Sequence, residues 1–500
     1  MAKRLCCVDH TRPGTKSIAG RWFCDEHHAK ATQKRSSVWR SAAIAVAGLL
    51  IFVGVVFGLD AALKPSLAGS ALLFTGIVLA LVPAALWLFF FYQQDRLEPE
   101  PVGHVARMFV LGLALAGAVG IPITSQLFRV GDWLYRDALT TWLGSIFLSG
   151  VVEAFIVYAV VRYFIFDSPE FDERSDGVVY ATAAALGYAT ALNLQFILSS
   201  GGGALGAAEI AVAEVALSRA AFGGLLGYFL GRARLEKEPI WWLSAGLALT
   251  ALLNGLFNIL LGQVDPGTIT LGGGAASGLS AFSGLILAGA LAVVVTAVVT
   301  WLINRDIARS LTGKQPAAEA DPTVGDREAN FATLGTFVAL ALVGVFAWNN
   351  AVNRTSAFDV GGFKGAYPAY FSETTQDGEV LRVADALGAA FVVRTWEVDS
   401  GSQASDVAGQ LAAERATDFE GYKVLSTGAT AVAGKAGVTA QRFAYVNSNT
   451  LTGAVPEVVE GLDYIFMDGN RTVVVSLYTT PEELDAFEPL FARFLNSLSF

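Results

Sequence analysis

The chain is poor in charged residues, in histidine and in cysteine, and each shortage narrows the class of protein. Only 16% of its 500 residues are charged and 54% are hydrophobic, whereas soluble domains carry about a quarter charged residues. This composition excludes an ordinary soluble protein and predicts a membrane protein surrounded by membrane lipid. The net charge of −10 gives no reason to expect a nucleic-acid partner.

Cysteine and histidine are confined to the start of the chain. All three cysteines lie in the first 24 residues, and the last histidine is His104. No disulfide framework is therefore available to the C-terminal part, and no imidazole occurs after His104. The N-terminus is polar for about 40 residues before any apolar run begins, so no cleavable signal peptide is expected.

What is abundant is long apolar runs. About 20 apolar residues are needed for a helix to span the hydrocarbon layer. Runs of this length predict nine spans, at roughly 41–63, 68–92, 106–127, 138–166, 177–199, 206–231, 239–262, 278–304 and 331–350. The predicted fold class is a polytopic α-helical membrane protein with about nine spans, a small N-terminal zinc-binding segment and a C-terminal soluble α+β domain.

Lysine and arginine in the loops predict the orientation in a cell membrane. Nine of them lie in the first forty residues, and further groups occur in RARLEK and in NRDIARSLTGK, on the same side as the N-terminus. Positive residues favour the cytoplasmic side. The N-terminus is therefore predicted to be cytoplasmic and the C-terminal domain extracytoplasmic.

The predicted organisation has five parts. They are a cytoplasmic Cys/His segment (1–35), an eight-helix membrane domain (41–304), a cytoplasmic linker (305–330), a ninth transmembrane helix (331–352) and the α+β domain (353–500).

In the last part, the β-rich runs 391–398 and 472–479 predict strands, and Asp468 with Gly469 predicts a hairpin turn. A final helix is expected, with Thr480 as N-cap, Pro481 in the first position and Glu483 closing a capping box. Pro489 is expected to bend or split this helix.

Two copies of the pattern C-x2-H lie close to the N-terminus. CVDH supplies Cys7 and His10, and CDEH supplies Cys24 and His27. Two such pairs joined by a loop are typical of a four-ligand structural zinc site. Cys6 or His28 could substitute for one of these ligands. The competing interpretation is an unstructured, reduced tail.

Several polar side chains fall within the predicted spans. A charged group at bilayer depth costs about 2.5–3.5 kcal/mol on insertion scales, so each requires a partner or a function. The candidates are Glu153, Asn193, Gln195, Glu214, Arg219, Asn254 and Asn258. Asn254 and Asn258 are four residues apart and share one helix face.

Residues 88–262 resemble the PrsW family of intramembrane metalloproteases, which is related to the CAAX-processing membrane proteases. The resemblance rests on the strings DRLEPEP, DGVVYATAAALGYATALN, GGLLGYFLG and NGLFN and on Glu153, in this order and spacing. It implies a helical membrane domain, proteolysis and a catalytic zinc.

The sequence departs from the family's pattern where that zinc would bind. The paired-glutamate motif E-E-x-x-K is reduced to Glu153, and the family's Glu-Asn reads Leu192–Asn193. Arg219 stands at the place of a family histidine, and Asn254 begins the string that matches His-Gly-x-x-Asn and ends at Asn258.

A hydrolytic zinc needs about three neutral-imidazole or carboxylate ligands and a base, so these substitutions make a catalytic zinc doubtful. We expect Glu153 to be the remnant of the site and Arg219 to fill the place of the metal as its counter-ion. Glu214, Asn193, Asn254 and Asn258 are expected to be hydrogen-bond partners. The alternative for Glu153 is a neutral carboxyl bonded to a neighbouring helix.

The C-terminal run TVVVSLYTTPEELDAFEPLFARFLNSLSF is similar to the end of Mog1/PsbP-like domains, which implies a binding module. The leading hypothesis is thus a catalytically degenerate PrsW-like protein, a signalling or interaction scaffold with a membrane or extracytoplasmic protein partner. The second is an active intramembrane metalloendopeptidase that cleaves membrane-anchored regulatory proteins. A transporter or channel is a third, without evident inverted repeats.

Overall fold

The structure is a computed structural model, and it describes most of the chain. The described residues exclude 1–4, 9–10, 19–20, 33–37, 64–66, 68, 95–99, 135–136, 200–204, 262–282, 313–324, 375, 377, 386–387, 400, 433, 448–456, 469 and 500. They form two compact units. The first comprises residues 1–128 and 141–345, and the second comprises residues 129–140 and 346–500.

Within the described residues, nine helical stretches are long and apolar enough to cross a membrane. They run over Arg40–Leu63, Gly69–Tyr92, Val102–Leu127, Ala138–Phe164, Arg174–Ser199, Glu209–Leu235, Trp242–Leu261, Ile286–Leu311 and Arg327–Asn353. Eight of them coincide with a predicted span to within about four residues, and Ile286–Leu311 begins eight residues and ends seven residues later than predicted. The nine helices support the multi-pass membrane class.

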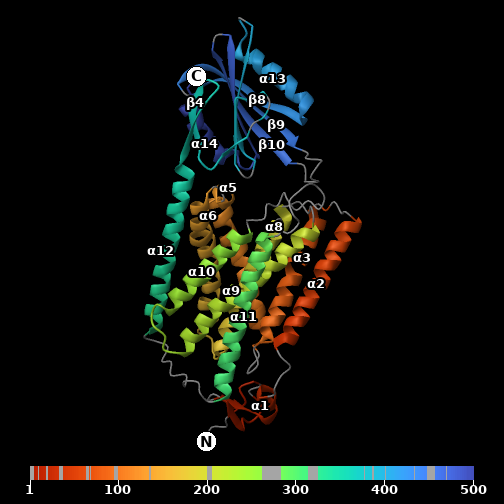
Figure 1. The fold of residues 1–500 in the computed structure, drawn as a ribbon, viewed down its shortest axis with the longest axis vertical. Helices are drawn as coiled ribbons and strands as arrows, with labels where there is room; N and C mark the ends of the chain where they lie inside the picture. Colours follow the sequence, from red (N-terminus) through yellow and green to blue (C-terminus); the bar gives the residue numbers. More distant parts are fainter. Residues whose placement is uncertain are drawn as a thin grey trace. The chain divides into compact units, whose positions relative to one another are not determined.

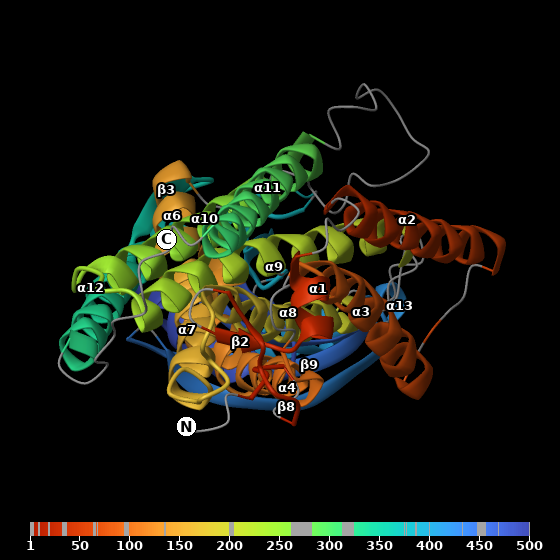
Figure 2. The same ribbon diagram turned by 90° about the horizontal axis from the view of Figure 1, so that it is seen from below.

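Figures 1 and 2 together label the helical elements of the spans. They are α2 (Val38–Leu63), α3 (Gly69–Tyr92), α4 (Val102–Leu115), α6 (Ala138–Gly144), α7 (Val151–Phe164), α8 (Arg174–Ser199), α9 (Leu205–Leu235), α10 (Trp242–Leu261), α11 (Ser283–Leu311) and α12 (Gly325–Asn353). Two spans also contain π-helical turns, η1 (Ala116–Gly120) and η2 (Pro122–Leu127) after α4, and η3 (Ser145–Gly150) between α6 and α7.

The centre of the helical domain is the pair α8 and α9. The two helices contact one another, α8 also contacts α3, α4 and α7, and α9 contacts α2, α10 and α11. Figure 2 looks along the helices and shows α8 and α9 in the middle of the set. Glycine permits this packing, because a Cβ on Gly227 would lie 2.0 Å from the Gly177 carbonyl oxygen.

The N-terminal segment is a small folded module. It contains the hairpin β1 (Lys16–Ile18) and β2 (Arg21–Phe23), followed by helix α1 (Asp25–Thr32). Ile18 and Phe23 are buried and pack in the same hydrophobic cluster as residues of the membrane helices. Its described residues are therefore folded, which argues against the interpretation as an unstructured tail.

The second unit contains a sheet-forming C-terminal domain, as predicted. The described strands are β3 (Thr355–Val360), β4 (Phe363–Pro368), β5 (Ser372–Glu373), β6 (Leu381–Ala384), β7 (Ala390–Glu397), β8 (Glu420–Val432), β9 (Lys435–Asn447), β10 (Glu457–Asp468) and β11 (Arg471–Thr479). β3 pairs with β4, and the other seven strands form one antiparallel sheet in the order β5-β6-β7-β11-β10-β9-β8.

The predicted strands at 391–398 and 472–479 correspond to β7 and β11, and the predicted hairpin joins β10 to β11. Asp468 pairs with Arg471 in the strand register, while Gly469 lies outside the described residues. Helix α13 (Ala404–Asp418) packs beside Val474, and α14 (Leu484–Ser497) packs through Phe491 against Phe391. The unit also includes α5 (Val130–Trp133).

The prediction for the start of the last helix is wrong. Thr480 is not its N-cap, because residues 481–483 form a turn and the helix begins at Leu484, with Glu483 in the cap position. The Glu483 amide donates to the Thr480 carbonyl oxygen (3.1 Å). Pro489 lies inside a continuous helix and does not split it, because it removes only one amide donor near the helix start.

Candidate functional site

Glu153 lies near the start of α7, directly after the π-helical turn η3. Gly150 ends that turn, and a Cβ there would lie 2.3 Å from the Ala251 carbonyl oxygen of α10. Only glycine permits this approach of η3 to α10. The local sequence therefore sets Glu153 beside α10, with 4% of its surface exposed.

Arg219 of α9 lies against this carboxylate. Its Nε is 2.5 Å from Glu153 Oε1, and the two side chains are 3% and 5% exposed. Its Nη2 donates to Asn258 Oδ1 of α10 (2.9 Å), and its guanidinium carbon lies 5.1 Å from the centre of the Phe257 ring. The structure thus brings together Glu153, Arg219 and Asn258, as we expected from the sequence.

The other expected partners do not join this group. Asn193 Nδ2 donates instead to the Val212 carbonyl oxygen of α9 (3.0 Å). Glu214 lies on a part of α9 that faces α11, within 3.3 Å of the position of a Cβ on Gly289. Among the described residues, Asn254 Oδ1 has no hydrogen-bond partner. These three residues could not be placed from sequence, because the spacing along a buried helix does not specify which of its faces packs against which neighbouring helix.

Tyr188 is a neighbour that the sequence did not single out. It is buried on α8, and its hydroxyl lies 2.7 Å from the position of a Cβ on Gly120. That contact is to η1, where a side chain would collide with the ring.

The residues around Glu153 do not fit a hydrolytic zinc. The single histidine between residues 100 and 288 is His104, which lies in the first turn of α4. The remaining carboxylate, that of Glu153, is paired with the Arg219 guanidinium, and a guanidinium stays protonated and cannot bind a metal. Asn258 uses its carbonyl oxygen as the acceptor for that guanidinium. This donor set supplies neither three ligands nor a free base.

A different metal-compatible group lies in the N-terminal module. Cys6, Cys24 and His27 place one sulfur or nitrogen atom each within 4.8 Å of one another. His27 Nδ1 is 3.4 Å from both sulfur atoms, close to the distance of about 3.6 Å between S and N ligands of a tetrahedral zinc. This group therefore fits a structural metal ion.

The ligand set differs in part from the predicted one. Cys24 and His27 are as predicted, and Cys6, the named substitute, takes the place given to Cys7. His10, the other predicted ligand, lies outside the described residues. The adjacent cysteines could not be told apart by spacing alone, because each lies within reach of Cys24.

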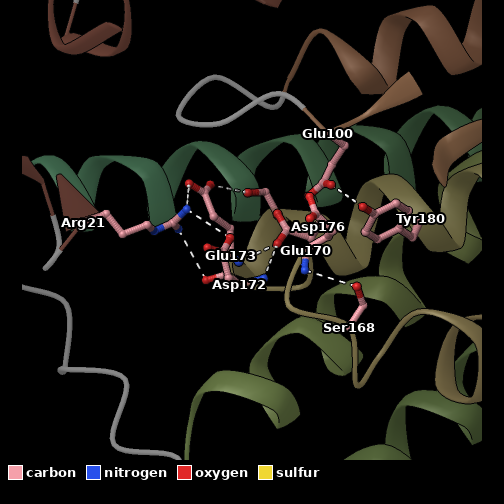
Figure 3. Close-up of polar contacts among 9 residues, drawn as sticks. Arg21, Glu100, Ser168, Glu170, Asp172, Glu173, Asp176 and Tyr180 are labelled. Atoms are coloured by element: carbon pink, nitrogen blue, oxygen red, sulfur yellow. Dashed lines mark hydrogen bonds and ion pairs between the residues drawn. The ribbon is translucent and has the colours of Figure 1, made fainter. Parts of the chain in front are cut away.

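A second polar cluster, which the sequence did not reveal, lies at the start of α8 (Figure 3). The Tyr180 hydroxyl donates to Glu100 Oε2, and Glu100 shares a further hydrogen bond with Asp176. Burial, joined by the nearby Glu173 and Asp172 charges, raises the pKa of Glu100 to about 7. The Glu-Pro-Glu-Pro string therefore supplies a buried acid to this cluster.

Comparison with known proteins matches this membrane domain. The model of the "PrsW family intramembrane metalloprotease" matches residues 100–288. "Protease PrsW" of Geobacillus kaustophilus (strain HTA426) is 31% identical over 193 residues, which cover 38% of this chain and 80% of that protein. "Protease PrsW" of Bacillus subtilis (strain 168) is 29% identical over 195 residues, covering 38% and 84%.

A weak structural likeness is found as well. The solution structure of cyanobacterial PsbP from Synechocystis sp. PCC 6803 covers 29% of this chain and 91% of its own, at 14% identity and a TM-score of 0.23. The detailed likeness of the C-terminal domain to Mog1/PsbP-like domains therefore stays a prediction.

The resemblance noted in the sequence is thus borne out across most of the length of these relatives. Apart from DRLEPEP, which precedes α4, its motifs lie on α7 to α10. The chain belongs to the PrsW family.

Proposed function

We propose that this chain is a PrsW-family membrane protein that no longer hydrolyses peptide bonds and acts as a signalling or interaction scaffold. The observation that carries the proposal is the contact of Arg219 with Glu153. A permanent cation now stands where the family resemblance implies a zinc ligand.

Electrostatics supports this interpretation. A guanidinium 2.5 Å from the carboxylate already neutralises the charge that would attract a dication, and it would repel a second cation at that distance. Asn258 accepts a hydrogen bond from this guanidinium with its carbonyl oxygen, so that oxygen is not turned toward a metal site. Glu153 is then a positioning group for the helices.

The other parts of the chain suit a scaffold. We assign a structural zinc to the N-terminal segment (1–35), an eight-helix membrane core to 41–304, a linker to 305–330, a ninth transmembrane helix to 331–352 and a binding domain to 353–500. Positive charge near the N-terminus favours a cytoplasmic module and an extracytoplasmic binding domain. The partner of that domain would be a membrane or extracytoplasmic protein.

The second candidate is an active intramembrane metalloendopeptidase. Family membership favours it, since its relatives carry the name protease. It requires a second metal ion held by groups other than histidine, near Glu153.

Metal analysis of the full-length protein separates the two candidates. The scaffold predicts zinc in the wild-type protein and none in the triple variant Cys6→Ser, Cys24→Ser, His27→Ala, with His104→Ala, outside the module, as the control that keeps its zinc. Zinc that persists in the triple variant and disappears on adding Glu153→Gln would support the metalloendopeptidase and overturn the scaffold.

A further inference from the structure

A charged side chain of the N-terminal module, that of Arg21, contacts acidic residues of the membrane domain. Arg21 Nη1 lies 2.6 Å from Glu173 Oε1 and 3.2 Å from Asp172 Oδ1, and its Nη2 donates to the Asp172 carbonyl oxygen (3.4 Å). The Glu173 side chain is only 4% exposed. Figure 3 shows Arg21 pointing into this acidic turn, which we define as residues 172–176.

The acidic turn is part of the start of α8. The Asp176 carboxylate accepts hydrogen bonds from the backbone amides of Asp172 (2.8 Å) and Glu173 (2.5 Å). The same carboxyl shares a hydrogen bond with Glu100. The turn therefore holds several carboxyl groups close together, which favours a cation beside them.

Arg21 is well suited to be that cation. Arg174 is the basic residue of the turn itself, and it is paired with Glu236, directly after α9 (2.5 Å). A planar guanidinium contacts the carboxylate of one residue and the carbonyl of the other at once, which a lysine could not reproduce.

The position of Arg21 depends on the fold of the module. Arg21 begins β2, which ends at the buried Phe23, directly before Cys24. The Cys7 amide donates to the Trp22 carbonyl oxygen (2.8 Å), which ties β2 to the segment that carries Cys6. A module of this size buries too little surface to fold firmly alone, so metal binding and folding are expected to be coupled.

We propose that the N-terminal module is a metal-dependent latch. A metal ion bound by Cys6, Cys24 and His27 keeps the Arg21 side chain in contact with the acidic turn at the start of α8. Loss of the ion loosens β2, withdraws Arg21 and frees the turn. The proposal rests on the metal assignment to the module in the proposed function, but not on the loss of proteolysis. In this proposal the module has a function, because binding or loss of the metal ion changes the conformation at the start of helix α8.

Hydrogen–deuterium exchange on the full-length protein in lipid nanodiscs tests the latch. The reporters are the amides of Asp172 and Glu173, because both are bonded to Asp176. Removing zinc with a chelator and the substitution Arg21→Gln should each speed their exchange about tenfold, the effect of losing roughly 1.4 kcal/mol of local stability. Chelation of the Arg21→Gln variant should add nothing further at these two amides.

Arg12→Gln is the matched control, because Arg12 pairs with Glu26 inside the module (2.5 Å). It should leave the reporters protected, and the charge exchange Arg21→Glu with Glu173→Arg should restore protection relative to Arg21→Glu alone. The latch is overturned if chelation speeds exchange in residues 21–24 but not at Asp172 and Glu173, or if Arg21→Gln has no effect there. It is also overturned if the module binds no metal, and this outcome leaves the proposal about Glu153 and Arg219 standing.

Discussion

Glu153 and Arg219 form an ion pair that is almost completely removed from solvent. Taking two charges out of water costs about as much as their attraction returns, so such a pair adds little net stability. Removing one partner is different, because the other charge is then left without compensation. The pair therefore makes each residue dependent on the other.

A double-mutant cycle on the pair follows from this dependence. Glu153→Leu and Arg219→Leu should each lower the free energy of unfolding by about 3–5 kcal/mol, and the double variant should lose much less than their sum. Thermal unfolding of the purified protein in detergent measures the three variants. Glu214→Gln is the control, since this carboxyl of α9 should show no coupling to Arg219→Leu. Additive losses, or harmless single substitutions, would contradict the pair.

Glu100 should make stability depend on pH. Burial raises its pKa in the folded protein from 4.5 to about 7, so the folded state holds this proton more tightly than the unfolded state. The contribution to stability is fully present below pH 4.5 and is lost as the pH rises through about 7.

Glu100→Gln replaces the acid with a neutral amide that can still accept the Tyr180 hydrogen bond. At about pH 8 it should raise the free energy of unfolding by roughly 3 kcal/mol relative to the wild type, and at about pH 4 the difference should vanish. Unfolding temperatures measured across this range check the prediction, with Glu170→Gln, in the loop between α7 and α8, as the control. An equal pH dependence in wild type and Glu100→Gln would show that another group is responsible.

At the scale of single residues, the sequence predicted the pair because a lone arginine and a lone glutamate stood at two family positions. It could not predict the acidic turn. Arg21 and Glu173 are 152 positions apart, and neither falls in a periodic pattern. Contacts of this kind depend on how separate elements pack, which spacing along the chain does not specify.

At the scale of elements, close helix packing depends on a few glycines. A Cβ on Gly112 of α4 would lie 2.0 Å from the Ala184 carbonyl oxygen of α8, whereas a Cβ on Gly103 of the same helix meets nothing within 4 Å. The first position therefore tolerates no side chain without separating α4 from α8.

Gly112→Ala should consequently destabilise the protein by about 1–3 kcal/mol through overpacking. Gly103→Ala should be neutral or raise stability by up to about 1 kcal/mol, because alanine favours the helix. Thermal unfolding of both variants provides the comparison. Equal stabilities would mean that α4 and α8 do not approach as closely as described.

The elements also show what could be predicted from sequence. The spans were predictable because a membrane helix needs a long apolar run, and this requirement is local. The start of α14 was not, since Thr480, Pro481 and Glu483 satisfy a capping pattern that the chain uses as a turn instead. The same residues can form either a capped helix start at Thr480 or a turn over 481–483, and the local sequence does not distinguish the two.

At the scale of the whole molecule, the chain joins a PrsW-family membrane domain to parts that carry separate chemistry. The metal-compatible group lies in the N-terminal module, and the membrane site holds an ion pair. We propose that the membrane site no longer binds the metal that the family name implies.

Cobalt(II) binding tests this claim most directly, because tetrahedral cobalt absorbs visible light and thiolate ligands add an intense charge-transfer band. The full-length protein should show the thiolate signature, and the triple variant Cys6→Ser, Cys24→Ser, His27→Ala should show no tetrahedral cobalt at all. A thiolate-free tetrahedral cobalt spectrum in the triple variant that disappears on adding Glu153→Gln would contradict the account, because Glu153 would then hold a metal and not Arg219.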